Sequence, residues 1–84
     1  MESHRFTKEL REFINRLISE ADGIRRNHPT TSDDSQIRET KWILDAYTGL
    51  KARDTETAVY FGHPDLAWSF DDRLHRLRTM ARLN

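Results

Sequence analysis

Phe6-Thr-Lys-Glu-Leu-Arg-Glu-Phe-Ile-Asn-Arg-Leu-Ile-Ser-Glu-Ala-Asp-Gly-Ile24 is the stretch of sequence that decides the fold. Its apolar residues recur every three or four positions and fill an arc of roughly 140° when the chain is wound at 100° per residue. Charged residues occupy the opposite face, and many stand four apart with opposite sign, such as Arg5 and Glu9. We therefore predict an amphipathic helix over residues 3–26, which the His28-Pro29 pair would end.

A second helix is predicted over residues 35–53, after a polar loop at residues 27–34. Asp33 stands three residues before Gln36, a spacing typical of a capping box, and Gly49 is a candidate terminator. The apolar residues of this helix cover roughly 220°, which is wider than one packed face requires. A helix this apolar must be covered on two sides, by the other helices or by another subunit.

The last long helix is predicted over residues 64–83, because Pro64 suits the first helical position and Asp65 suits the first turn. Residues 54–63 are predicted as irregular structure or a short helical turn. The Ala58–Phe61 run is too short for periodicity to distinguish a helix from a strand. Residues 1–84 are thus expected to form one all-α domain, a small antiparallel three-helix bundle. A long helical hairpin with an ordered helical tail is the alternative.

Composition narrows the class of protein. The chain has 84 residues, 14 Lys and Arg against 14 Asp and Glu, and no Cys. Balanced charge argues against a protein that coats nucleic acid nonspecifically, and the absence of Cys excludes disulfides and thiolate zinc sites. No apolar run reaches the roughly 18 residues of a membrane span, so we expect a cytoplasmic protein with no membrane partner. Arg exceeds Lys by 11 to 3, which we associate with a bacterial or phage gene.

The sequence offers little for catalysis. The four histidines show neither His-Glu-x-x-His nor His-x-x-x-His spacing, and the four-residue spacing of Asp71 and His75 is interpreted as a surface contact. No Gly-x-Ser-x-Gly elbow or phosphate-binding glycine loop is present. We therefore expect no enzymatic activity, no metal and no cofactor.

Aromatic and arginine residues carry the strongest functional signal, because Trp, Tyr and Arg are enriched at the energetic centres of protein interfaces. Trp68 falls opposite the apolar stripe of the last helix, so packing along that stripe leaves it uncovered. We expect a non-enzymatic protein-binding module: a regulator, adaptor or inhibitor of another protein, for example a phage or bacterial inhibitor of a host or defence factor. Self-association as a homodimer is the related option. The predicted partner-binding residues are Trp42, Tyr47, Tyr60, Phe61 and Trp68 as anchors, with Arg76, Arg78 and Arg82 as a polar rim.

Two other interpretations stay open. The arginines of the last helix could contact phosphates, which would make the chain a nucleic-acid-binding regulator. Alternatively, positive charges near the C-terminal end of a helix interact favourably with the helix dipole, and this accounts for the positions of the same arginines without a ligand. Likewise, Tyr60 and Phe61 could cover Trp68 and form a small satellite core within the chain.

Overall fold

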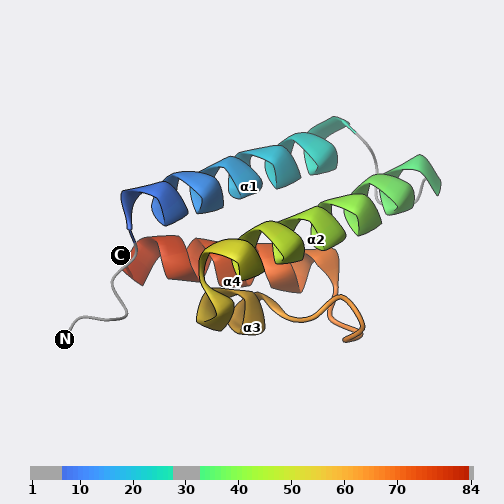
Figure 1. Ribbon diagram of the computed structural model, residues 1–84. Helices are drawn as coiled ribbons and strands as arrows, with labels where there is room; N and C mark the ends of the chain where they lie inside the picture. Colours follow the sequence, from blue (N-terminus) through green and yellow to red (C-terminus); the bar gives the residue numbers. More distant parts are fainter. Residues whose placement is uncertain (1–6, 28–32, 84) are drawn as a thin grey trace.

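The computed structural model describes residues 7–27 and 33–83, and this part of the chain forms four helices and no strand. The helices are α1 (Lys8–Asn27), α2 (Asp33–Arg53), α3 (Thr55–Phe61) and α4 (Phe70–Leu83) (Figure 1). The predicted all-α, small bundle is therefore confirmed. The first helix does not extend through residue 7 as predicted, because Thr7 precedes α1 and its hydroxyl accepts the Leu10 N–H. Residues 27, 33 and 34, predicted as loop, are helical. The predicted helical start at residue 3 and the rest of the predicted loop lie outside the described residues.

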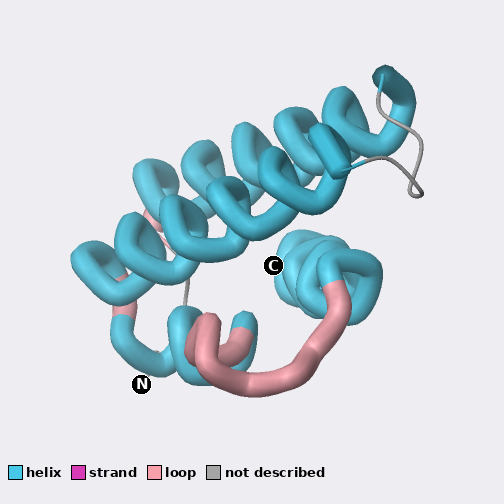
Figure 2. The backbone as a smooth tube through the Cα atoms, turned by 90° about the vertical axis from the view of Figure 1, so that its right-hand side faces the viewer, coloured by secondary structure: helices cyan, strands magenta, loops and turns pink. Residues whose placement is uncertain are grey.

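The two longest helices, α1 and α2, lie side by side and run in opposite directions, and α1 also runs opposite to α4 in the same view (Figure 1). In Figure 2 α4 is seen nearly end-on while α1 and α2 extend across the view, so α4 crosses the hairpin at a steep angle. The short α3 and the loop after it bring the chain back to the point where α4 begins. Three long helices thus enclose one core, and α3 closes its lower side.

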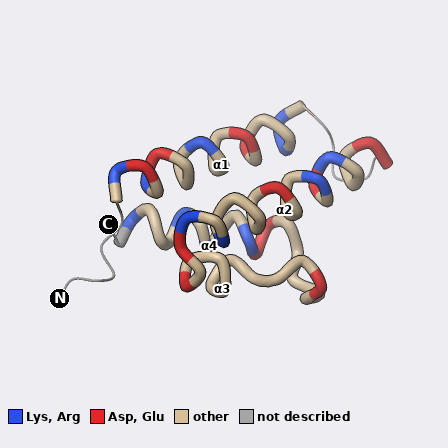
Figure 3. The backbone as a smooth tube through the Cα atoms, in the orientation of Figure 1, with Lys and Arg blue, Asp and Glu red and all other residues tan. Residues whose placement is uncertain are grey.

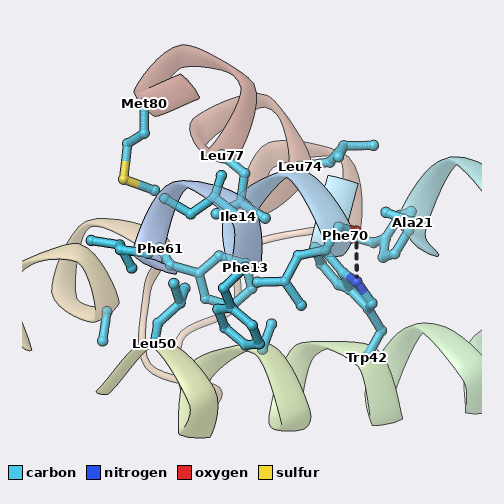
Figure 4. Packing of buried hydrophobic residues seen from close by; sticks show 14 residues of the cluster. Phe13, Ile14, Ala21, Trp42, Leu50, Phe61, Phe70, Leu74, Leu77 and Met80 are labelled. Carbon is cyan, nitrogen blue, oxygen red and sulfur yellow. Dashed lines mark hydrogen bonds between the residues drawn. The ribbon is translucent and has the colours of Figure 1, made fainter. Parts of the chain in front are cut away.

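The core is a single cluster to which every helix contributes (Figure 4). Its centre holds side chains with no exposed surface, among them Leu50, Phe61 and Leu77. Gly49 lies inside α2, four residues before its end, and does not terminate it; a Cβ there would collide with the Phe13 ring of α1. The buried apolar residues are Leu10, Phe13, Ile14, Leu17, Ala21, Trp42, Ala46, Leu50, Ala58, Phe61, Phe70, Leu74, Leu77 and Met80.

The ambiguous segment before Gly62 forms helix α3. Asp54 precedes the helix in an extended conformation, accepts the Ala58 N–H at its carbonyl oxygen and receives the Thr57 hydroxyl at its carboxylate. Gly62 ends the helix with a φ of 104°, a backbone conformation that glycine adopts without steric cost. The buried residues Ala58 and Phe61 lie on the side of α3 that packs on the core, which explains why this short segment is helical.

The last helix begins at Phe70, so the predicted start at residue 64 is wrong. His63 accepts the N–H of Asp65 at its ring nitrogen and the N–H of Leu66 at its carbonyl, which closes a tight turn instead of a helix. Ser69 caps α4, because its hydroxyl accepts the Asp72 N–H at 3.0 Å. The Pro64-Asp65 pair predicts the earlier start, and the Ser69-x-x-Asp72 spacing that forms this cap was not identified from the sequence.

Candidate protein-interaction surface

Two of the predicted anchors, Trp42 and Phe61, lie in the core, with 5% and 0% of their surface exposed. Their rings meet edge to face at a centroid distance of 5.6 Å, and Trp42 contacts Phe70 in the same way at 5.0 Å. The Trp42 indole N–H donates to the Leu17 carbonyl of α1 at 3.1 Å (Figure 4). Their contacts are internal, so we leave both residues out of the candidate surface.

Three other predicted residues come together at the surface between α3 and α4. The guanidinium carbon of Arg76 lies 4.1 Å from the centre of the Trp68 ring and 5.1 Å from that of Tyr60. Arg76 also donates to the Tyr60 carbonyl at 3.3 Å. Attraction between a cation and an aromatic face is worth roughly 0.5–1 kcal/mol at exposed sites. We call Tyr60, Trp68 and Arg76 the aromatic–arginine cluster.

The surroundings of the cluster are partly apolar. Leu66, in the loop between α3 and α4, has 43% of its surface exposed, and Tyr60 has 40%. Trp68 is half-buried and rests against Gly62, where an added Cβ would collide with the Trp68 ring. The satellite-core interpretation therefore holds only in part. Phe61 belongs to the main core, and the Arg76 guanidinium lies over the rings of both Trp68 and Tyr60.

Arg73 holds this surface in place, and the sequence did not single it out for that role. Its side chain is 1% exposed and donates to five backbone carbonyls of the segment just before α4. Distances are 3.5 Å to Phe61, 3.1 Å to His63, 3.0 Å to Leu66 and 3.2 Å to Trp68, and the fifth acceptor is Gly62.

No described carboxylate pairs with Arg73, so carbonyl oxygens and the ring faces of Phe61 and Trp68 replace the water lost by its guanidinium. Burial lowers the pKa of Arg73, and the neighbouring charge of Arg76 lowers it further. A guanidinium nevertheless stays protonated in proteins. The buried and permanently charged Arg73 side chain therefore holds the loop that carries Leu66 and Trp68 in place.

The remaining predicted residues lie apart from the cluster. Tyr47 is half-buried on α2, with its ring 5.1 Å from that of His63. Arg78 forms an ion pair with Asp22 of α1, on the other flank of α4 from Arg76. Arg82 is exposed near the end of α4. The predicted polar rim is thus divided, and only Arg76 borders the aromatic residues.

A second apolar surface, on the outside of α2, was not among the predicted site residues. Ile37 and Leu44 are 67% and 48% exposed, and both border a depression of about 510 Å³. A neighbouring groove of about 390 Å³ lies between α1 and α2, where Gly23, Ile24 and the edge of Trp42 meet charged side chains. In the sequence, the wide apolar arc of this helix had indicated that one of its sides must be covered by another helix or subunit.

Both depressions are bordered by charged side chains of both signs, including Lys41 and Asp45. Among the described residues, no group of three or more His, Cys, Asp or Glu side chains is placed to hold a metal ion. Acidic and basic positions alternate along α1 and α2 in Figure 3. No described helix is long and apolar enough to cross a membrane.

Comparison with known proteins adds no family to this geometry. No protein-family model, curated protein or solved structure that was compared with the chain matches it.

Proposed function

We propose that this chain is a non-enzymatic protein-binding module, a regulator, adaptor or inhibitor that acts on another protein through the aromatic–arginine cluster. One observation carries the proposal: Trp68 lies outside the main core, on a loop whose carbonyls bind a buried arginine, and its half-buried ring has the Arg76 guanidinium 4.1 Å from its centre. Trp, Tyr and Arg are the residue types that dominate interface energetics. The proposal sets this activity in the cytoplasm of a bacterial or phage-infected cell.

Prior ordering of the loop supports binding at this surface. A partner that docks on a flexible loop loses affinity because the loop must be ordered on binding. Here the five carbonyl contacts of Arg73 order the loop in the free chain. A partner with an apolar patch and one acidic or carbonyl group would match exposed Leu66, the Trp68 ring and the edge of Arg76.

Nucleic-acid binding by α4 is the weaker candidate. Of the four arginines proposed to contact phosphates, Arg73 is buried, Arg76 stacks on aromatic rings and Arg78 is paired with Asp22. Arg82 is exposed, and one arginine makes a small phosphate-binding surface. Phosphate binding by the other three would have to replace their internal contacts. A partner protein needs no such rearrangement. Nucleic acid is therefore the competing outcome of the affinity-capture experiment.

The test is affinity capture from nuclease-treated lysate of the source organism, with the wild-type chain and single variants compared. Leu66→Asp and Trp68→Ala alter the cluster, and Ile37→Asp is the matched control, because Ile37 is equally apolar, more exposed and on the outside of α2. We expect a stoichiometric protein with the wild type and the control, but not with either cluster variant. Equal recovery by all four chains contradicts the proposal. Recovery of nucleic acid alone, when nuclease is omitted, favours the competing function.

A further inference from the structure

The outside of α2 carries an apolar stripe that the described part of the chain leaves uncovered. Ile37 and Leu44 are seven residues apart, almost two helical turns, so they project from nearly the same side of the helix. That side is opposite to the one where Trp42, Ala46 and Leu50 pack into the core. Burying a large aliphatic side chain is favourable, so two of them at 67% and 48% exposure point to a covering surface.

We propose that a second copy of this chain covers the stripe, through antiparallel pairing of the two α2 helices about a two-fold axis. The pairing goes beyond the protein-binding function proposed above and uses a different surface. The stripe is made of Ile37 and Leu44, with Asp33 and Lys51 at its two ends and Thr40 near its middle.

The apolar residues are self-complementary in this arrangement. A two-fold axis midway between Thr40 and Lys41 brings Ile37 beside Leu44 of the partner subunit, and Leu44 beside Ile37 of the partner subunit. Each chain thereby covers both of its exposed aliphatic residues with the same two residues of its copy. Thr40 lies next to the axis, where its small side chain allows the helices to approach.

Charge is self-complementary in the same register. The helix begins with acidic residues and ends with basic ones. Asp33 and Lys51 are 18 residues apart, which is five turns, so they lie on the same flank of α2. The two-fold axis places the partner subunit's Lys51 within about one turn of Asp33, at each end of the pair. Antiparallel helices also set opposite dipole ends side by side.

This match favours a second copy over an unrelated partner, because one face pairs both of its aliphatic residues and the charges at its two ends with itself. Lys41 also borders the axis, so its ammonium group must extend away from its own copy into solvent. Small domains with modest cores commonly gain stability by oligomerisation. One helix per subunit gives an interface toward the low end of the roughly 1,200–2,000 Å² of stable complexes. The dimer is therefore expected to dissociate on dilution.

Sedimentation velocity over a concentration series tests the pairing on the full chain. We expect the wild type to shift from monomer to dimer, and Ile37→Glu to weaken the dimer at least tenfold. Val59→Glu is the matched control, because Val59 is 65% exposed on α3, and it should leave the dimer unchanged. A wild type that stays monomeric up to ~1 mM, or a dimer unaffected by Ile37→Glu, overturns the proposal.

Charge and cysteine variants test the register. Lys51→Asp should weaken the dimer, and addition of Asp33→Lys should restore it, whereas two additive losses contradict the pairing. The chain has no Cys, so Thr40→Cys creates a single thiol that should oxidise to a covalent dimer. Val59→Cys, at an equally accessible site, should not. These readouts leave the Leu66 and Trp68 surface intact, so this proposal and the proposed function can fail separately.

Discussion

The two tryptophans of this chain occupy contrasting environments. Trp42 is 5% exposed, lies between the rings of Phe61 and Phe70, and donates its indole N–H to a backbone carbonyl. Trp68 is half-buried, lies outside the main core and meets the guanidinium groups of Arg76 and Arg73. Trp42 thus contributes to folding, whereas Trp68 is held at the surface.

The difference lies in what contacts each ring. Edge-to-face aromatic contacts add up in a closed core, where every ring loses its water. A guanidinium covers one ring face while keeping its own edge toward solvent or a ligand. Arginine therefore lets a large aromatic residue stay ordered without being fully buried. We expect sites of this kind wherever a small helical domain keeps a tryptophan available for a partner.

Replacement of each tryptophan by Ala tests this contrast, and it is expected to give the largest difference in the free energy of unfolding. Trp42→Ala should lower the free energy of unfolding by about 3–5 kcal/mol, because it leaves a large cavity and removes the hydrogen bond to the Leu17 carbonyl. Trp68→Ala should cost only about 1–2 kcal/mol, since its ring is partly exposed already. Urea denaturation monitored by circular dichroism measures both. Equal losses would mean that Trp68 is a core residue.

Loss of the buried guanidinium should affect the Trp68 side alone. Arg73→Met keeps the apolar stem but removes the guanidinium donor from five carbonyls, of which that of His63 still accepts the Leu66 N–H, and we expect a loss of about 2–4 kcal/mol. Arg73→Lys retains the charge without the planar fork of donors, so it should recover only part of the loss. Hydrogen exchange should show loosening of residues 62–69 while the α1–α2 hairpin stays protected. Uniform loosening would contradict this prediction.

Replacement of two glycines by Ala tests the surroundings of Trp68 with smaller expected changes in stability. Gly62→Ala should destabilise the chain by about 1–3 kcal/mol, because φ is 104° and the new Cβ meets the Trp68 ring. Gly23→Ala is the control: this glycine is helical with open space around it, and the change should stabilise by about 0.5–1 kcal/mol. Thermal unfolding distinguishes the two directions. Destabilisation by both would mean that Gly23 also has a packing role.

The smallest effect is expected from Arg76→Ala. Removal of one part-exposed cation from the Trp68 and Tyr60 rings should cost about 0.5–1 kcal/mol. Acrylamide quenching of tryptophan fluorescence should rise, because Trp68 becomes more accessible while Trp42 does not change. Arg82→Ala, another exposed arginine of α4, is the control and should alter neither quantity. Unchanged quenching would show that Arg76 does not cover Trp68.

Helical periodicity predicted most of the fold. The first two long helices lie over the predicted apolar stretches, and α2 ends at Arg53 as expected, but α1 begins after Thr7 and α2 begins at Asp33, two residues earlier than predicted. The start of α4 was not predicted because Pro64 and Asp65 fit a helix as well as a turn. Their conformation is decided by the His63 ring and carbonyl, which capture the next two N–H groups. Such competition between local hydrogen bonds is invisible in residue spacing.

The candidate site was harder to predict, and Trp42 shows why. Exposed Ile37 and Leu44 widen the apolar arc of α2 and shift its apparent centre away from the true buried side, which is marked by Ser35, Trp42 and Ala46. Arg73 was unpredictable for another reason. Its partners are backbone carbonyls, which every residue possesses, so no residue type in the sequence reveals them.

The Arg73 contacts also have a consequence for the order of folding. They join residues only 5–12 positions apart, whereas the ion pairs of α1 with α4, Arg25–Asp71 and Asp22–Arg78, close loops of 46 and 56 residues. Short loops close at lower entropic cost and earlier. The segment around Arg73 and the α1–α2 hairpin, which Arg25 and Glu39 join across only 14 positions, should therefore form before α1 meets α4. The surface that bears Trp68 would then exist before α1 and α4 are joined.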